Sequence, residues 1–463
     1  MVTMTIWTTD HSTALLTDHY ELTGLDAALV SGVAHHRATF ELFSRGLPNG
    51  RRYGVVAGVA RAVDAVRRFR FEPDELEYLS ARGFLRQDTL DYLANYHFSG
   101  SIHGYRDGEV YFPYSPLITV DSTFGEALIL ETILLSVVNH DSAVASAAAR
   151  MAATAQSQGR TTIEGGARRT HEQAGVSASL AAFIAGIDVT SNLEAGRRFD
   201  IPTAGTTMHA FTLAHNSEAE AFEVQAEVMG PGSTYLVDTY DIATGIERAV
   251  EAAGTAIGAV RLDSGDIGIE ALRARVQLDS LGATGCQIVV SGDLDEYRVA
   301  ELADAPIDRY MFGTRLVTGS GAPTAELVYK LVAIADSPEL DADMRPVAKT
   351  SQGKGHRGGR KVATRIIGAD GYALAERLLT DIDLVEPLPA ENHERALQVP
   401  WIVDGELVRP FVAEASRAHH LTARAELRPE WLDLADGDPA LVGAPPSMTS
   451  QPVPKNAPQE VPR

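Results

Sequence analysis

Residues 235–266 have the sequence YLVDTYDIATGIERAVEAAGTAIGAVRLDSGD, and this stretch decides the fold. It begins with an apolar run that ends in Asp238, continues through an amphipathic helix at 243–254, and returns to an apolar run at 259–263. Strand and helix patterns that alternate in this way are typical of a parallel sheet covered by helices. The stretch therefore predicts a βα unit of an α/β protein.

The same alternation extends from about residue 160 to about 320. Apolar runs predict strands at 201–206, 235–238, 259–263, 287–291 and 310–313. Amphipathic patterns predict helices at 216–229, 243–254, 267–282 and 294–304. The sheet of this region is therefore parallel, and the pattern leaves open whether it is flat or closed into a barrel.

Both flanks of this region have a different pattern. Strands are predicted at 39–43 and 101–104 with helical segments across 71–96, which indicates an α+β unit. A helical pattern, first Leu-rich and then Ala-rich, covers 124–159. The last segment, 444–463, is Pro-rich without periodicity and is predicted to be disordered.

Composition excludes several classes of function. The 463 residues contain 40 Lys and Arg against 62 Asp and Glu, a net charge of −22, which argues against binding to nucleic acid or to anionic membranes. The single cysteine, Cys286, forms no internal disulfide and suits a reducing compartment. We expect neither a secretory signal, since the N-terminus lacks a basic segment, nor a membrane span, since Glu131 interrupts the most apolar run.

Polar and glycine-rich steps follow each predicted strand, at 205–206, 238–241, 263–266, 291–296 and 313–315. Parallel α/β sheets bind their ligands at the C-terminal ends of the strands, so these residues are expected at one site. Arg261 and Asp263 suit an anionic substrate and a Mg²⁺ ion or ribose hydroxyls. A solvated turn explains each of these segments equally well when it is taken alone. The sequence favours an enzyme because such a segment follows every predicted strand of the sheet.

Three further features suit an anion, and each has a structural alternative. The dipeptides in SGD (291–293) and GTR (313–315) can bind phosphate through backbone N–H groups or form plain turns. EGGARR (164–169) is either an arginine clamp or an exposed basic helix start. The run at 345–365 has seven Lys and Arg and no acid, which indicates either a flexible phosphate-binding loop or a solvated loop.

Eight segments together resemble the bacterial type of the nicotinate phosphoribosyltransferase family across roughly residues 11–440. They are LLTDHYEL (15–22), EGGARR (164–169), DVTSNLEAG (188–196), GTTMHA (205–210), VDTYD (237–241), RLDSGD (261–266), SGDLDE (291–296) and FGTRL (312–316). Many relatives carry an aromatic residue at the position of Gly165, so one face of the nicotinate stack is expected to be supplied differently here.

This resemblance implies a type II phosphoribosyltransferase fold. An irregular α/β barrel over 124–335 would carry the active site, and an α+β domain would combine 1–123 with 336–443, leaving 444–463 as a tail. The implied reaction joins nicotinate to 5-phosphoribosyl 1-pyrophosphate with ATP hydrolysis, giving nicotinate mononucleotide, pyrophosphate, ADP and phosphate. It belongs to NAD salvage in the cytoplasm.

The resemblance also assigns roles to individual residues. His209 matches the histidine that ATP phosphorylates, and Asp238 and Asp263 match acidic residues at the ribose and Mg²⁺. The residues expected at nicotinate are Tyr20, Arg168, Ser191, Thr206 and Arg261. Those expected at phosphate groups are Gly292, Asp293, Gly313, Thr314 and, for ATP or pyrophosphate, Lys354. Tyr20 would come from the partner subunit, which implies a homodimer with shared active sites.

Three other functions were weighed against this one. Nicotinamide phosphoribosyltransferases carry an aspartate at the position of Ser191, where a carboxylate would repel nicotinate, so Ser191 favours the acid. A non-catalytic metabolite-binding homologue is the second alternative. A phosphate-binding aldolase or isomerase is the third, but residues 200–320 contain no lysine for a Schiff base.

Overall fold

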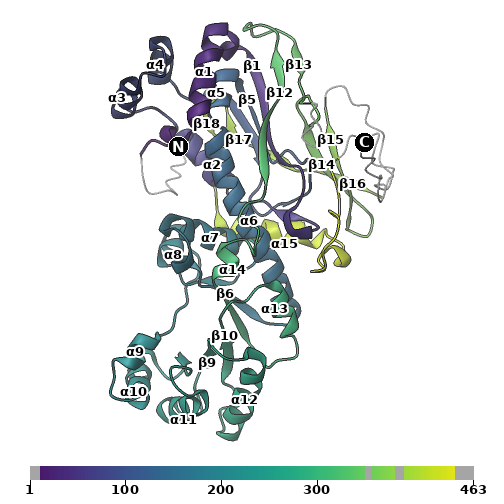
Figure 1. Cartoon of the computed structure of the whole chain (residues 1–463). Coiled ribbons are helices and arrows are strands. Elements are labelled where there is room, and N and C mark those ends of the chain that lie inside the picture. Colours follow the sequence, from purple (N-terminus) through teal and green to yellow (C-terminus); the bar gives the residue numbers. More distant parts are fainter. Residues whose placement is uncertain (1–10, 350–355, 381–390, 444–463) are drawn as a thin grey trace, which may run out of the picture.

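The computed structural model describes residues 11–349, 356–380 and 391–443. Lys354 and the predicted tail at 444–463 therefore lie outside the described residues. Figure 1 shows two lobes, one built on an antiparallel sheet and the other on a parallel sheet.

The first lobe contains a seven-stranded antiparallel sheet formed by both ends of the chain. Its strands, in spatial order, are β13 (Met344–Pro346), β12 (Leu327–Ala335), β1 (Arg37–Ser44), β5 (Ile118–Thr123), β3 (Ser101–Tyr105), β17 (Gln398–Val403) and β18 (Glu406–Leu407). The α+β domain built from N-terminal and C-terminal segments is thus confirmed. The predicted barrel boundary at 335 is wrong, because β12 pairs with β1. Apolar strand patterns do not reveal which sheet a strand joins.

Smaller elements complete this lobe. The helices are α1 (His19–Ser31), α2 (Val59–Arg67), α3 (Pro73–Arg82), α4 (Gln87–Ala94) and α5 (Phe124–Leu128). A three-stranded sheet contains β15 (Ala373–Leu379), β14 (Val362–Ile367) and β16 (His393–Ala396), and a two-stranded one contains β2 (Gly54–Val55) and β4 (Val110–Tyr111).

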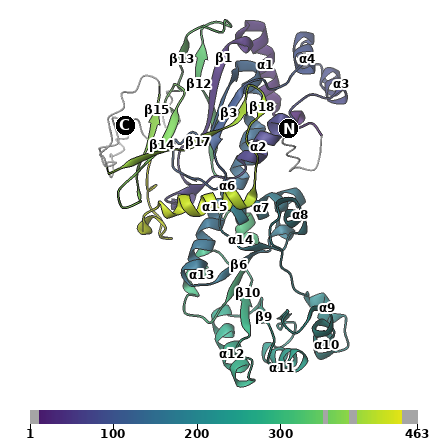
Figure 2. The same cartoon turned by 180° about the vertical axis from the view of Figure 1, so that it is seen from behind.

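Two helices connect the lobes. The first half of α6 (Glu131–Ser157) contributes Ile133 and Leu134 to the core of the antiparallel lobe, and its second half contributes Met151 to that of the parallel lobe. α15 (Ala413–Ala425) lies at the junction, as Figure 2 shows, against α7 and β4. None of the described helices has the length and apolarity that a membrane span requires.

The second lobe contains a six-stranded parallel sheet. Its spatial order is β7 (Val189–Thr190), β6 (Thr161–Glu164), β11 (Arg309–Phe312), β10 (Gln287–Val290), β9 (Ala259–Leu262) and β8 (Thr234–Leu236). Its helices are α7 (Glu172–Ile184), α8 (Leu193–Phe199), α9 (His209–Leu213), α10 (Glu218–Met229), α11 (Ile242–Ala253), α12 (Ile267–Ser280), α13 (Glu296–Glu301) and α14 (Thr314–Val317). The sheet curls into an irregular barrel that stays open between β7 and β8 within the described residues.

The predicted strand at 201–206 is wrong. Within it only Thr203 forms a bridge, to Thr190 of β7. Pro202 has no N–H group to donate, and the segment then leaves the sheet toward α9. The two strands that do occupy this side, β6 and β7, were not predicted, since each is too short to show a clear alternation.

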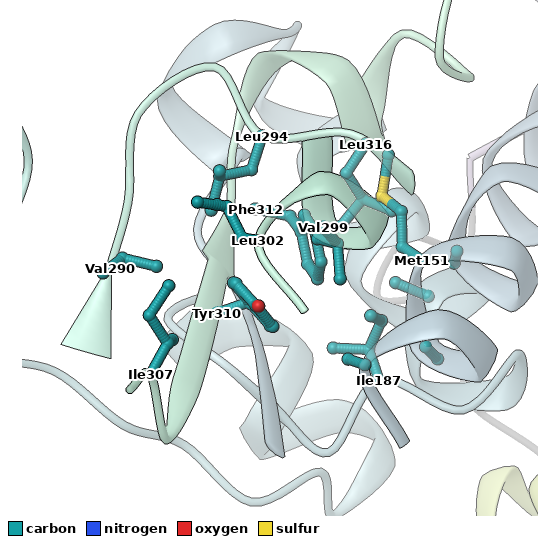
Figure 3. Packing of buried hydrophobic residues seen from close by; sticks show 14 of the residues in the cluster. Met151, Ile187, Val290, Leu294, Val299, Leu302, Ile307, Tyr310, Phe312 and Leu316 are labelled. Atoms are coloured by element: carbon teal, nitrogen blue, oxygen red, sulfur yellow. The ribbon is translucent and has the colours of Figure 1, made fainter. Parts of the chain in front are cut away.

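β11 shows how the sheet separates core from cavity. Tyr310 and Phe312 are fully buried and pack toward the helices, near Met151 and Leu316, as Figure 3 shows. Arg309 and Met311 alternate with them and point to the other face, where they line a cavity. Unlike the packed interior of a closed barrel, this face is therefore open to a ligand.

The basic run at 345–365 is not the flexible anion-binding loop that we predicted, at least where it is described. Arg360 forms an ion pair with Asp121 at 2.9 Å, and Lys361 forms one with Glu41 at 2.8 Å. Arg365 lies in β14, fully buried between Glu109 and Glu376. Asp121, Glu41 and Glu109 belong to the N-terminal segment and are distant in sequence from these cations, so the composition alone did not reveal these pairs.

Candidate active site

Two connected cavities open at the C-terminal ends of the parallel strands. The inner cavity, of about 310 Å³, extends along the sheet between β6, β9 and β11 toward residues 204–208. The loop cavity, of about 240 Å³, lies among the loops that follow β6, β9, β10 and β11. Both are lined by Gly165, Arg168, Arg261 and Met311, so they form one site with two compartments.

The loop cavity contains the predicted phosphate-binding residues that are described: Gly292, Asp293, Gly313 and Thr314. Gly292 has φ of +101°, and a Cβ atom there would lie 3.2 Å from the carbonyl oxygen of Asp263. Only glycine allows this turn without strain, and it brings backbone groups close to the cavity. Arg169 adds an exposed cation, which was predicted only as part of the EGGARR motif and not as a site residue.

Arg261 is held in place at the junction of the two cavities. Its Nε donates to Ser291 Oγ at 3.0 Å, and its guanidinium lies 3.4 Å from Asp263 Oδ1. Ser291 in turn donates to Asp263 Oδ1 at 2.5 Å. Ser291 was not predicted as a site residue, although its place directly before Gly292 was a usable signal.

The inner cavity contains Arg168, Ser191 and Thr206, as predicted. It also contains Arg309 and Met311, which sequence reasoning missed. The missed signal was the alternation in RYMF (309–312), which places these two side chains on the same face.

His209 and Asp238 lie near each other beside the open edge of the barrel. The Asp238 side chain is 1% exposed, and its Oδ2 accepts hydrogen bonds from the Asp263 N–H and the Ser264 hydroxyl, both at 2.9 Å. Its Oδ1 is buried, has no hydrogen-bond partner among the described residues, and lies 3.9 Å from His209 Nε2. His209 Nδ1 is 3.1 Å from Thr239 Oγ1, and its ring is 43% exposed. The histidine is thus oriented yet accessible.

Comparison with known proteins identifies the family of this chain. Residues 15–139 match the model of the nicotinate phosphoribosyltransferase N-terminal domain. Nicotinate phosphoribosyltransferase pncB1 of Mycobacterium tuberculosis is 48% identical over 435 residues, which cover 92% of this chain and 94% of that protein. The nicotinate phosphoribosyltransferase of Bacillus subtilis is 36% identical, with 78% of this chain and 75% of that protein covered. This chain belongs to the nicotinate phosphoribosyltransferase family.

A solved structure of this family has the same fold. Human nicotinic acid phosphoribosyltransferase superposes with a TM-score of 0.75 at 25% identity, over 93% of this chain and 97% of the human chain. The predicted type II phosphoribosyltransferase fold is therefore confirmed. Membership of the nicotinate phosphoribosyltransferase family also sets aside the aldolase or isomerase hypothesis.

Among the described site residues that were predicted, Tyr20, His209 and Asp238 do not line the two cavities, and Tyr20 lies in the other lobe. It lies on α1 in the antiparallel lobe, far from the parallel sheet in Figure 1, and is 52% exposed. Partial burial, together with the carboxylates of Glu131 and Glu21, raises the pKa of its phenol to about 12. Tyr20 therefore stays a neutral ring at physiological pH.

The residues expected to hold Mg²⁺ fit that ion in part. The buried, unpartnered Oδ1 of Asp238 is a carboxylate oxygen that still needs a cation or a donor. Asp263 Oδ1 already has Ser291 and Arg261 as partners. Mg²⁺ commonly takes only one or two protein carboxylates and completes its shell with substrate phosphates and water, so a single carboxylate such as Asp238 is compatible with that ion.

Proposed function

We propose that this protein is a nicotinate phosphoribosyltransferase, which joins nicotinate to 5-phosphoribosyl 1-pyrophosphate while hydrolysing ATP to ADP and phosphate. The observation that carries the proposal is the division of the site. One compartment has glycine-rich loops for a phosphate, and the adjoining one has cations and hydroxyls for a small aromatic acid. The high identity to a relative of that name supports it.

The two substrates occupy adjacent compartments in this proposal. The ribose 5-phosphate lies in the loop cavity, on the backbone of Gly292, Asp293, Gly313 and Thr314. Nicotinate lies in the inner cavity with Ser191 and Thr206 as hydrogen-bonding partners, and Arg168 and Arg261 are cations within reach of both compartments.

The transfer itself needs no covalent protein nucleophile. The pyridine nitrogen of nicotinate forms a bond to C1 of the ribose, and the C1–O bond breaks with its electron pair leaving on pyrophosphate. The protein mainly orients the two reactants and stabilises charge. Asp238, with Asp263 nearby, would hold a Mg²⁺ ion, which would supply positive charge for the departing pyrophosphate.

ATP acts through His209. With Nδ1–H directed at Thr239, Nε2 keeps the lone pair that attacks the γ-phosphorus of ATP, and ADP leaves. Water later cleaves the phosphohistidine and releases phosphate. The added negative charge lies beside the edge of the barrel and can order the neighbouring loops, which links ATP hydrolysis to substrate affinity.

A homodimer completes the site in this proposal. Because Tyr20 lies far from the cavities of its own chain, it would stack on the nicotinate of the partner subunit. We also assign Lys354 to ATP or pyrophosphate, and we place the enzyme in the cytoplasm. The buried, unpaired Cys286 is consistent with that compartment.

Incubation with γ-labelled ATP tests the role of His209. We expect acid-labile label on the native protein and none on His209→Ala. The matched control His215→Ala should keep the label, because the contacts of this ring among the described residues are to Phe211. Label that persists on His209→Ala would exclude this residue as the acceptor.

Substrate preference tests the reaction. At equal phosphoribosyl pyrophosphate, the protein should release pyrophosphate far faster with nicotinate than with nicotinamide. Equal or reversed preference would favour the nicotinamide enzyme. Nicotinate binding in calorimetry without any turnover would favour the non-catalytic homologue.

A further inference from the structure

The inner face of β11 carries two side chains to which none of the site motifs assigns a role. Arg309 and Met311 are two residues apart on one strand, so both point into the inner cavity with about 7 Å between their Cα atoms. This separation matches the length of a single aromatic ring with one substituent. The pair therefore forms one wall of the compartment.

Arg309 is the cation that belongs to the inner cavity alone. Arg168 and Arg261 line both cavities, and Arg261 is already engaged by Ser291 and Asp263. Arg309 is half-buried, and no hydrogen bond or ion pair to its guanidinium occurs among the residues that the structure describes. A partly desolvated cation without a carboxylate partner gains strongly from an anionic ligand, which a guanidinium can hold with two parallel hydrogen bonds.

Met311 occupies the space above Gly165. A Cβ atom on Gly165 would lie 2.2 Å from Met311 Cε, so any larger residue at 165 displaces the methionine. Both residues line both cavities, which puts the thioether where the two compartments meet. Thioethers make favourable contacts with aromatic rings and adapt to irregular spaces. Met311 thus provides the apolar surface that a side chain at position 165 would otherwise supply.

We propose that Arg309 and Met311 select the base: Arg309 binds the carboxylate of the pyridine ring, and Met311 contacts the ring itself. This inference rests on the proposed function and adds to it the two residues that distinguish the acid from its amide.

Steady-state kinetics on Arg309→Gln tests whether Arg309 binds the carboxylate. We expect the KM for nicotinate to rise about 10- to 100-fold, since one partner of a charge pair is lost. The KM for phosphoribosyl pyrophosphate should not change, and the preference for nicotinate over nicotinamide should narrow. Arg309→Lys should recover part of the affinity, because it keeps the charge without the planar fork.

The control is Arg273→Gln, which removes an exposed cation that pairs with Glu270 on α12. It should behave as the native protein. If Arg309→Gln keeps the native KM for nicotinate, the inference is wrong while the proposed function stands. If the native protein itself releases no pyrophosphate with nicotinate, the proposed function fails first.

Substitutions that exchange side-chain volume between positions 165 and 311 test the contact of Met311 with the ring. Gly165→Phe alone should raise the KM for nicotinate by about tenfold or more, because the ring and Met311 compete for one space. Adding Met311→Gly to it should restore most of the affinity, since the phenyl ring then takes the place of the thioether. A double variant no better than Gly165→Phe would show that Met311 does not form this wall.

Discussion

The basic run at 345–365 and the inner face of the barrel contain the same kind of residue in opposite situations. Arg365 is fully buried and bonded to Glu109 and Glu376, both at 2.9 Å. Arg309 has no carboxylate partner within the described residues and lines a cavity. The difference teaches that a cluster of cations in the sequence marks a ligand site only if tertiary partners have not already neutralised it.

The largest effect on stability should come from removing the buried ion pairs of Arg365. Arg365→Met removes the buried cation between Glu109 and Glu376, and although Glu109 keeps Arg395, we expect the free energy of unfolding to fall by about 3–5 kcal/mol. Denaturant titration measures it. The matched change Arg345→Met removes an exposed pair with Asp336 and should cost less than about 1 kcal/mol. Similar losses for both variants would contradict the comparison.

The dependence of protein stability on pH tests the role of His420, which interacts with Glu109 in the same region. Burial lowers the pKa of this imidazole from 6.5 to about 4, while Nδ1 bonds to the Gly108 carbonyl. Between these values the unfolded chain binds the proton and the folded one does not, so stability falls as pH decreases from about 6.5 to about 4. The contribution is roughly 3 kcal/mol.

His420→Leu should remove the part of this dependence that lies above about pH 5. Its neighbour Glu109 acts in a lower window, because Arg365, His419 and Arg395 outweigh its desolvation and hold its pKa well below 4.5. The stability that Glu109 contributes is present above that value and is lost as pH falls further. An unchanged profile between pH 6.5 and 5 in His420→Leu would contradict the assignment.

The smallest effect should come from the site, where cations line a cavity and face a ligand. Ser291→Ala removes the acceptor that orients Arg261, and we expect about a fivefold rise in the KM for nicotinate, equivalent to about 1 kcal/mol. Its stability should stay close to native. Ser280→Ala, which bonds only to the Gln277 carbonyl on the surface of α12, is the control.

Local patterns predicted much of the parallel lobe. The strands at 259–263 and 287–291 follow from apolar runs, and the helix between them follows from a period of 3.6 residues; each segment carries its pattern within itself. The polar steps after these strands predicted one edge of the sheet as the site, and Arg261, Asp263 and Gly292 do meet there. The order of the eight motifs predicted the family.

Only the tertiary structure decided which residues meet across the chain. In that structure β12 pairs within the antiparallel sheet, residues 201–206 do not form a strand of the parallel sheet, and Arg365 bonds to Glu109, which is 256 positions away in the sequence. The tertiary structure also turned Arg309 and Met311 toward the cavity instead of the core. The sequence by itself determined the elements and the chemistry of their ends, because these depend on neighbouring residues. Pairing, burial and the face of a strand depend on distant ones, so folding alone distinguishes a cation that stabilises the protein from one that is available to a substrate.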